Sequence, residues 1–324
     1  MPRVCIVSPA LAAANNGNWH TASRWQRFLA PVAQVEIRGV AEGAADADLL
    51  IALHARRSAE TITRWREARP GAPIALVLTG TDLYRDLDID PSTRHSLQCA
   101  SAIIVLQEAG LARLDAASRA RARVIVQSAT ALVAAHRPGD ADFVAVGHLR
   151  DEKDPATLMK AVRLLADEAQ ASPVISHIGE ALDAALGDEA RATMAACPAY
   201  RWLGAQPHAA ARRAIARARC LVHASRIEGG ANVVIEAVRS RVPVLASRID
   251  GNVGLLGAGY DGYFAFGDAS ALATLMRRFV DDAAFAARLR AQCDAREPLF
   301  RPATERCAVR ALVADLAAPR SSRR

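Results

Sequence analysis

The sequence predicts an α/β fold with two doubly wound parallel sheets, and three observations lead to that prediction. Short β-branched runs alternate with longer helical stretches along the chain, as expected of parallel βαβ units with right-handed crossovers. This alternation stops at the polar stretch AAHRPGDAD (residues 134–142), which contains a Pro-Gly pair, and then begins again. A chain of 324 residues is also long enough for two domains with separate cores.

Ten short apolar runs are expected to form the strands of the two sheets. Before the polar stretch they are RVCIVSPA (3–10), ADLLIAL (47–53), PIALVLTG (73–80), SAIIVLQ (101–107) and ARVIVQS (122–128). After it they are DFVAVGHL (142–149), PVISHIGE (173–180), YRWLGA (200–205), CLVHAS (220–225) and PVLASRID (243–250). We therefore expect Rossmann-like domains at 1–138 and 139–299, followed by a C-terminal helix and a basic tail over 300–324 that return to the first domain.

Composition and charge narrow the classes of function. Hydrophobic residues make up 52% of the chain and charged residues 23%, an ordinary globular profile. No apolar run approaches the ~20 residues of a membrane helix, and the amino terminus lacks the layout of a signal peptide, so a cytoplasmic protein without a membrane partner is expected. The net charge of +7 arises from arginines spread over helices, which favours anionic small-molecule substrates over nucleic acid. The oligomeric state is left open.

The cysteines and histidines predict neither a metal site nor a disulfide framework. The six cysteines are scattered, and the eight histidines form no set with the spacing of metal ligands. No pair of carboxylates in a DxD pattern occurs within the loop segments ANNGNW (13–18), HARR (54–57), TGTDLYRD (79–86) and GHLRDEKDP (147–155). We therefore expect no metal and no cofactor.

The segment IEGGANVVIEAV (227–238) is the strongest functional signal. Glycines after a predicted strand and before a predicted helix leave backbone amides open to phosphate or sugar oxygens. Glu228 and Glu236 bracket these amides with seven residues between them, and either carboxylate can accept hydrogen bonds from neighbouring hydroxyls. The alternative is a capping glutamate and a solvent-facing one. The amides expected to bind ligand belong to Gly229, Gly230, Ala231 and Asn232.

The segment GHLRDEKDP (147–155) offers positive charge at the next predicted strand end. Arg150 and Lys153 are suited to neutralise a diphosphate leaving group without a metal. The alternative is an exposed charged turn.

Taken together, these two segments and CLVHASRIEGG resemble the donor domain of GT-B glycosyltransferases, whose hallmark is two glutamates separated by seven residues. The resemblance covers about residues 142–256. It implies that Glu236 holds the ribose of a nucleotide sugar and that Glu228 holds the sugar hydroxyls. Arg150 and Lys153 would hold the diphosphate, so that Lys153, Arg150 and Glu228 are the implied catalytic groups. His148 stands where the family has an arginine, and it joins the implied donor-binding set.

Blocks along nearly the whole chain resemble a narrower family, the selenosugar synthases of selenoneine biosynthesis. They include PALAAANNGNWHTASRW, DLLIALHARRSA, VLTGTDLYRD and LASRIDGNVGLLG. The resemblance implies that selenophosphate attacks the anomeric carbon of UDP-N-acetylglucosamine or UDP-glucose, that UDP is released, and that phosphate is then lost to leave a selenosugar.

An acceptor of this kind is already nucleophilic, so its site needs anion donors more than a general base. The resemblance brings Gly17 close to the donor. The acceptor's phosphate is proposed to bind to residues of the same loop and of the two next loops, namely Asn15, Asn16, Asn18, His54, Arg56, Arg57, Thr79, Gly80 and Thr81. Each of these assignments has a structural alternative. The asparagines are also explained as residues that stabilise a turn, and Arg56 and Arg57 as solvated residues on a helix surface. Asp82 and Arg85 are able to form a local ion pair.

Two alternatives remain for the function. A conventional GT-B enzyme acting on a hydroxyl acceptor needs a general base, for which His20, His54 and Asp82 are the candidates. A non-catalytic protein that binds nucleotide sugars would bind the same ligands without releasing UDP.

Overall fold

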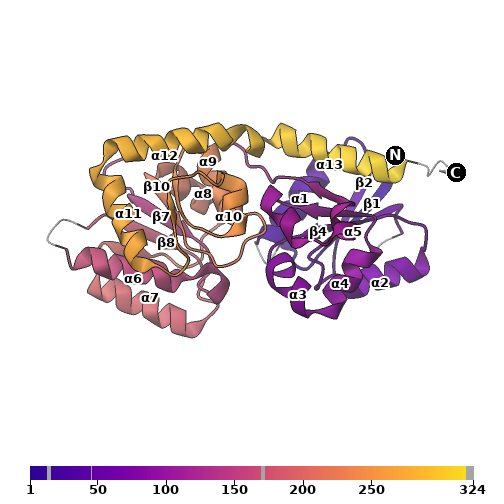
Figure 1. The fold of residues 1–324 in the computed structure, drawn as a ribbon, viewed down its shortest axis with the longest axis horizontal. Helices are drawn as coiled ribbons and strands as arrows, with labels where there is room; N and C mark the ends of the chain where they lie inside the picture. The colour runs from indigo at the N-terminus through magenta and orange to yellow at the C-terminus, as the bar shows by residue number, and fades with distance from the viewer. Residues whose placement is uncertain (13–15, 45, 169–171, 319–324) are drawn as a thin grey trace. The chain divides into compact units, whose positions relative to one another are not determined.

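The computed structural model describes residues 1–12, 16–44, 46–168 and 172–318, which form two compact units (Figure 1). Unit 1 comprises Met1–Gln127 and Pro302–Arg324, and unit 2 comprises Ser128–Arg301. The sequence analysis places the first boundary at 138/139 instead. Residues 128–137 have no helix or strand, but carbonyls of Ala129 and Thr130 accept hydrogen bonds from arginines of unit 2, so this segment belongs to unit 2. The return to unit 1 comes after Arg301 rather than after residue 299.

Unit 1 contains one parallel sheet with the strand order β2-β1-β3-β4-β5-β6. Its strands are β1 (Arg3–Ser8), β2 (Gln34–Gly39), β3 (Leu49–Leu53), β4 (Ile74–Leu78), β5 (Ala102–Val105) and β6 (Ala122–Val124). Its helices are α1 (Gly17–Leu29), α2 (Ala59–Ala68), the π-helix η2 (Asp82–Asp86), α3 (Leu87–Ile89), α4 (Pro91–Cys99), the 3-10 helix η3 (Glu108–Arg113), α5 (Ala116–Arg119) and α13 (Pro302–Ala317).

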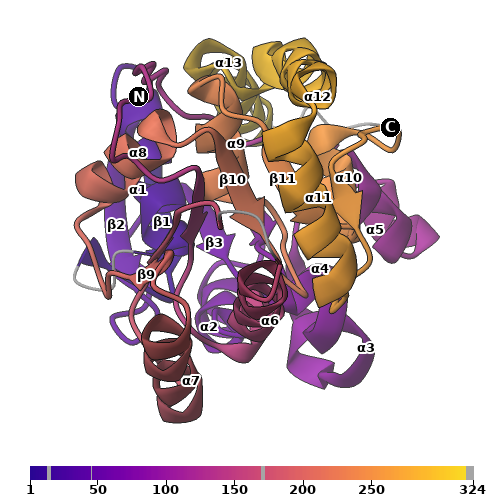
Figure 2. The same cartoon turned by 90° about the vertical axis from the view of Figure 1, so that its left-hand side faces the viewer.

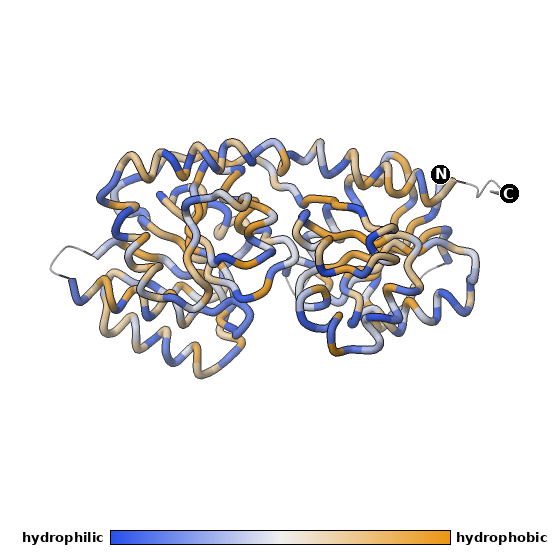
Figure 3. Tube along the Cα trace, in the orientation of Figure 1, coloured by the Kyte–Doolittle hydropathy of each residue, from blue (hydrophilic) through white to orange (hydrophobic). Residues whose placement is uncertain are grey.

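The sheet of unit 1 is buried on both faces, which explains why its strands are continuous apolar runs. Successive residues of β3 point to opposite faces. Leu49 and Ile51 join a core with helices α1 and α13, whereas Leu50 and Ala52 join a core with α2 and α4. Figure 3 shows the hydrophobic residues concentrated along the strands.

Helix α13 is part of the core of unit 1, although it lies at the other end of the sequence. Its Val309, Leu312 and Val313 are buried against the first core. Its Glu305 is also buried and accepts hydrogen bonds from Arg24 Nε at 2.7 Å and Trp25 Nε1 at 2.7 Å, both of α1. The buried carboxylate is thus paired, as a charge in a protein core must be.

Unit 2 contains a second parallel sheet with the strand order β12-β11-β10-β7-β8-β9. Its strands are β7 (Phe143–Val146), β8 (Ile175–Ile178), β9 (Tyr200–Trp202), β10 (Cys220–His223), β11 (Val244–Ser247) and β12 (Tyr263–Phe264). Its helices are the 3-10 helix η4 (Asp151–Lys153), α6 (Pro155–Ala166), α7 (Ala184–Ala196), α8 (His208–Arg217), α9 (Asn232–Arg239), α10 (Asp250–Leu256), α11 (Ala269–Asp281), α12 (Ala283–Arg296) and the 3-10 helix η5 (Glu297–Phe300).

Helices cover both faces of this second sheet (Figures 1 and 2). Phe143 of β7 packs edge-on against Phe279 of α11, with ring centroids 5.6 Å apart. The next residue, Val144, lies with Ala210 and Ala214 of α8 along a cavity. Neighbouring residues of β7 thus face helices on opposite sides, as a doubly wound sheet requires.

The structure confirms the predicted α/β class with two doubly wound parallel sheets. All ten predicted strands are present, and β2 and β12 are additional strands at sheet edges. Within the described ranges, no helix has the length and apolar content required to cross a lipid bilayer.

Candidate active site

The strand order of unit 2 marks a place for a ligand. The connections run from β7 outward to β8 and β9 on one side, and from β10 outward to β11 and β12 on the other. Strands β7 and β10 are therefore the switch point, where doubly wound sheets bind ligands beyond the carboxyl ends of the strands. A small cavity lies there, lined by Ala145, Val146, Gly147, Lys153, Leu158, His177, Val222, His223, Ala224 and Ser225.

Two residues predicted for the site meet beside this cavity. The Nζ atom of Lys153 lies 2.5 Å from Oε1 of Glu228, and both side chains are largely buried. Burial alone would raise the pKa of the Glu228 carboxyl, but the charge of Lys153 and the nearness of His223 outweigh it and hold that pKa below its usual range. The Glu228 carboxyl is thus held in its charged form beside Lys153.

Two further polar groups near the end of β10 make no well-directed hydrogen bond within the described part of the chain. His223 Nε2 lies 3.2 Å from Oε1 of Glu228, but among the described residues it makes no well-directed hydrogen bond, and neither does the buried Oγ of Ser225. Buried polar groups without partners are rare because they have lost their water. Both groups line the cavity, so they are suited to bind a polar ligand. The sequence analysis did not single out His223 or Ser225. His223 is the last residue of β10, and Ser225 lies two residues after it, before the glycine-rich loop.

The glycine-rich loop connects this strand end to helix α9. Gly229, Gly230 and Ala231 lead into the helix, which begins at Asn232 without a side-chain cap. Amides of an uncapped first turn carry partial positive charge and donate hydrogen bonds to an anionic or hydroxyl oxygen.

Glu236 lies on α9, and its environment argues against the alternative that one of the two glutamates caps the helix and the other faces solvent. It is 6% exposed, and its Oε1 lies 2.7 Å from Nε2 of His208 and 3.9 Å from Nη1 of Arg212. Glu228 is buried as well. Neither glutamate is a solvent-facing residue or a helix cap, so both are placed for interactions other than those with bulk water.

The loop after β7 carries the remaining predicted donor residues. Lys153 points inward, whereas the side chain of Asp151 is 70% exposed. The His148 ring accepts a hydrogen bond from the amide of Glu180 at 3.2 Å, and burial together with the charge of Arg150 lowers its pKa. The Arg150 guanidinium is 43% exposed, with Nε 3.8 Å from Oε2 of Glu152. The segment is therefore not merely an exposed turn.

Two glycines that the sequence analysis did not select hold these loops in place. A Cβ on Gly179 would lie 1.9 Å from the carbonyl oxygen of Gly147, and one on Gly251 would lie 2.2 Å from that of Glu228. Real Cβ atoms do not approach oxygen so closely, so both positions require glycine. Gly251 can be found in the sequence as the glycine of RIDGN, but only the folded structure shows that it contacts Glu228.

The switch point of unit 1 lies between β1 and β3, and the predicted acceptor residues follow these strands and β4. Asn15 lies outside the described residues. The Oδ1 of Asn16 accepts hydrogen bonds from the amides of Asn18 at 3.1 Å and Trp19 at 3.3 Å, so Asn16 caps helix α1, which begins at Gly17. This geometry matches the structural explanation for Asn16.

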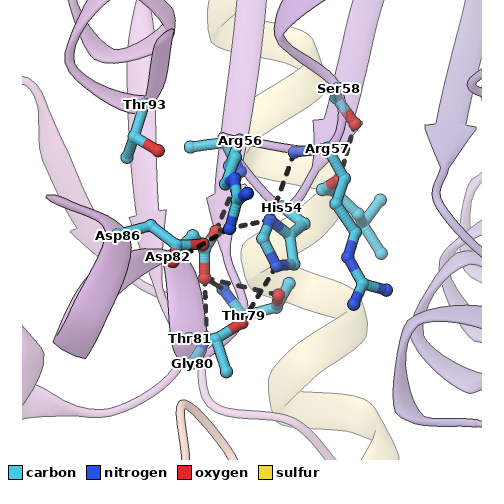
Figure 4. A network of polar contacts seen from close by, with 12 residues as sticks. His54, Arg56, Arg57, Ser58, Thr79, Gly80, Thr81, Asp82, Asp86 and Thr93 are labelled. Atoms are coloured by element: carbon cyan, nitrogen blue, oxygen red, sulfur yellow. Dashed lines mark hydrogen bonds and ion pairs between the residues drawn. The ribbon is translucent and has the colours of Figure 1, made fainter. Parts of the chain in front are cut away.

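The loops after β3 and β4 meet in a polar network (Figure 4). His54 Nε2 lies 3.0 Å from Oγ1 of Thr81. The fully buried Asp82 accepts hydrogen bonds from the amides of Ala55, Thr79 and Gly80 at 2.8–2.9 Å.

This network corrects part of the sequence analysis. The amides of Thr79 and Gly80 were expected to be exposed, but the Asp82 carboxylate already occupies them. Arg56 contacts Asp90 at 3.1 Å and Asp86 at 3.5 Å, and Arg85 contacts Asp86 rather than Asp82.

Within the described part of the chain, no group of three or more histidine, cysteine, aspartate or glutamate side chains is arranged to hold a metal ion.

Comparison with known families decides what kind of protein carries this site. The family model "Glycosyl transferases group 1" matches residues 133–296, which is half of the chain. The protein is a group 1 glycosyltransferase. No curated protein matches this glycosyltransferase.

Solved structures share the fold of this glycosyltransferase. HepE from Anabaena, in complex with UDP-glucose, is 15% identical, with a TM-score of 0.76 over 97% of this chain and 100% of its own. Sucrose-phosphate synthase from Thermosynechococcus elongatus is 15% identical, with a TM-score of 0.78 over 98% and 99%. The pneumococcal O-GlcNAc transferase GtfA, in complex with UDP and GlcNAc, is 15% identical, with a TM-score of 0.67 over 84% of this chain and 57% of its own. The fold of the group 1 glycosyltransferase is thus the GT-B architecture.

Proposed function

We propose that this group 1 glycosyltransferase binds a UDP-sugar in unit 2 and transfers the sugar to a small anionic acceptor. The observation that carries the proposal is the buried ion pair of Lys153 and Glu228 at the switch point of the second sheet. A cation that can bind a diphosphate lies there beside a carboxylate that can bind sugar hydroxyls. A nucleotide sugar carries its diphosphate and its sugar next to each other in the same way. The complexes of HepE with UDP-glucose and of GtfA with UDP and GlcNAc support a UDP-sugar donor.

The donor-binding roles follow from the chemistry of each group. We assign the ribose hydroxyls to Glu236 and the sugar hydroxyls to Glu228, with the amides of Gly229 to Asn232 on sugar and phosphate oxygens. Lys153 and Arg150 stabilise the charge that develops on the β-phosphate as the anomeric C–O bond breaks. His148 is kept uncharged by its surroundings and serves as a hydrogen-bonding group rather than as a cation.

For the acceptor we propose selenophosphate, on the resemblance of the sequence blocks to selenosugar synthases. Its selenium attacks the anomeric carbon, the new C–Se bond forms, and the electron pair of the breaking C–O bond leaves with UDP. Water then cleaves the Se–P bond, which releases phosphate and the selenosugar. Selenium needs no deprotonation by a base, so binding of the acceptor's phosphate is what the protein must supply.

A second candidate is a conventional transferase with a hydroxyl acceptor. The family match and the fold shared with the O-GlcNAc transferase GtfA favour it. This candidate needs a general base. Burial lowers the pKa of His54, but its Nδ1 accepts a hydrogen bond from the Arg57 amide, so the ring would have to release that amide before it takes up a proton.

Mass spectrometry of a reaction with freshly prepared selenophosphate tests both candidates. The protein is mixed with UDP-N-acetylglucosamine or UDP-glucose, and UDP release is followed in parallel. A sugar with the selenium isotope pattern, formed in equal amount to UDP, supports the proposal. UDP release with alcohol acceptors alone supports the hydroxyl transferase. UDP binding without release under all conditions contradicts both and leaves a nucleotide-sugar-binding protein.

A further inference from the structure

Two adjacent arginines, Arg56 and Arg57, follow β3 at the switch point of unit 1, and their guanidinium groups have different surroundings. The guanidinium of Arg56 points toward the buried Asp86 (Figure 4), which it contacts at 3.5 Å, and it contacts the partly exposed Asp90 at 3.1 Å. Its charge is matched by these carboxylates, so little attraction remains for another anion.

Arg57 points away from those carboxylates (Figure 4) and is exposed. Among the residues that the structure describes, no side chain forms a hydrogen bond or ion pair with its guanidinium. A planar guanidinium without a partner is suited to bind two oxygens of a tetrahedral oxyanion at once. Arg57 therefore offers the charge that Arg56 does not.

His54 lies between these arginines and determines what the Thr81 hydroxyl can do. The amide of Arg57 donates to His54 Nδ1 at 3.4 Å, so Nδ1 carries no proton. The nearest carboxylate oxygen, Oδ2 of Asp82, is 3.9 Å from Nδ1, too far for a hydrogen bond. The neutral ring then holds its proton on Nε2 and donates it to Oγ1 of Thr81 at 3.0 Å.

The Thr81 hydroxyl oxygen accepts the hydrogen bond from His54. Its own proton therefore points away from His54 and is free to be donated to another acceptor. Thr81 is half-buried, so a ligand has access to it. The His54 backbone adopts a φ of +69°, which non-glycine residues adopt rarely and mostly at functional sites. The arrangement makes Thr81 a hydrogen-bond donor and gives His54 the part of a positioning residue.

We propose that Arg57, and not Arg56, supplies the positive charge that binds the acceptor's tetrahedral oxyanion in unit 1, with the Thr81 hydroxyl as a hydrogen-bond donor positioned by His54. This inference rests on the proposed function for the identity of the acceptor, selenophosphate. The binding of the oxyanion itself does not depend on catalysis and is measurable without it.

The test compares two neighbouring substitutions in the full-length protein. Binding of inorganic phosphate is measured by isothermal titration calorimetry or ³¹P NMR for the wild type, Arg57→Ala, Arg56→Ala and the exposed control Arg64→Ala. Arg57→Ala is expected to weaken phosphate binding by about 10- to 100-fold, with the other two within about twofold of the wild type. Equal losses in Arg56→Ala and Arg57→Ala, or no loss in Arg57→Ala, overturn the inference.

Substitutions at Thr81 test the hydroxyl. Thr81→Val keeps the shape of the side chain and removes the donor, so it should raise the KM for selenophosphate without changing the KM for the UDP-sugar, and Thr81→Ser should restore it. A Thr81→Val variant with an unchanged KM for selenophosphate overturns the role of Thr81.

The two proposals fail in different ways. If the wild type releases no UDP from any UDP-sugar, the proposed function fails. If phosphate binding still depends on Arg57 but selenophosphate is not a substrate, the acceptor's identity fails while the oxyanion site remains. Phosphate binding that is absent from the wild type contradicts the oxyanion site itself.

Discussion

Lys153 is the residue on which the charge of the proposed donor site depends. Without a ligand its ammonium group neutralises Glu228 at 2.5 Å, so the site stays balanced inside a largely buried environment. A diphosphate would compete for the same ammonium group, which leaves the Glu228 carboxylate available to sugar hydroxyls. On the proposed function, binding of the diphosphate and binding of the sugar would thereby be coupled through the Lys153 side chain.

Lys153→Ala is expected to lower kcat by about 10²- to 10³-fold, because the charge on the leaving diphosphate loses its stabilising cation. Lys160, exposed on helix α6, is the matched control, and Lys160→Ala should retain the wild-type rate. Steady-state kinetics of UDP release measure both variants, and circular dichroism checks their folding. Wild-type kcat in a folded Lys153→Ala variant would remove the assignment.

His177 should make the stability of unit 2 depend on pH. Burial lowers its pKa to about 4, whereas in the unfolded chain it titrates near 6.5. The unfolded state therefore takes up a proton first as the pH falls, and the free energy of unfolding decreases from about pH 6.5 downward, by about 2 kcal/mol at pH 5. Stability is regained as the pH rises through this window.

Urea unfolding of the wild type and His177→Gln at pH 7.5 and pH 5 measures this contribution. The difference in unfolding free energy between the two pH values should be smaller in the variant by about 2 kcal/mol. The comparison isolates His177 from His54 and His148, whose pKa values are also lowered. Identical pH dependences in the two proteins would contradict the prediction.

At the scale of elements, helix α10 holds the glycine-rich loop of the donor site. Gly251 lies so close to the Glu228 carbonyl that an added Cβ would approach it to 2.2 Å. Gly251→Ala should therefore displace the loop, cost about 1–3 kcal/mol of stability and raise the KM for the UDP-sugar. Gly259→Ala is the control, since open space surrounds that glycine. Thermal melts and donor kinetics measure the pair, and equal behaviour of the two variants would show that α10 does not support the loop.

The sequence predicted elements with a strong local signal and missed those without one. Strands buried on both faces, such as β3 and β4, stand out as continuous apolar runs. Strand β2 is half-exposed at a sheet edge, and β12 has two residues, so neither produces such a run. Both strands pair with a neighbouring strand, and their few apolar residues, Val35 and Ile37 in β2 and Phe264 in β12, pack inward.

The site was predictable in its loops and not in its contacts. The glycine-rich loop and both glutamates follow from local patterns, but the contact of Lys153 with Glu228 joins residues 75 positions apart. The difference between Arg56 and Arg57 likewise depends on Asp86 and Asp90, which the helices after β4 bring near one of them. The hydrogen bonds from the amides of Ala55, Thr79 and Gly80 to the buried Asp82 carboxylate likewise form only in the folded chain.

At the scale of the whole molecule, the two units differ in how the chain builds them. Unit 2 is one continuous segment that contains every residue of the proposed donor site except Gly17, whereas unit 1 is made from two segments separated by unit 2. A fragment of residues 128–301 is therefore expected to fold cooperatively and to bind UDP, as measured by calorimetry. A folded fragment without affinity for UDP would contradict the location of the donor site.

A fragment of residues 1–127 should not reach a stable fold. It lacks Val309, Leu312 and Val313 of the core, each worth about 1.5–3 kcal/mol when buried, a loss comparable to the ~5–15 kcal/mol that stabilises a typical domain. It also leaves Arg24 without the carboxylate of Glu305. Joining residues 302–318 to this fragment through a flexible Gly/Ser linker should restore cooperative unfolding. A stable fragment without them would contradict the role of α13.

The position of α13 also determines the order in which the protein is completed during synthesis. Domains usually fold in the order in which they leave the ribosome, but here the first domain to be translated cannot be finished until the second has been made. At about 5–20 residues per second, the face of the first sheet that receives α13 waits on the order of ten seconds or more with its apolar residues uncovered. Nascent chains at that stage are the form of this protein most exposed to aggregation and to chaperones.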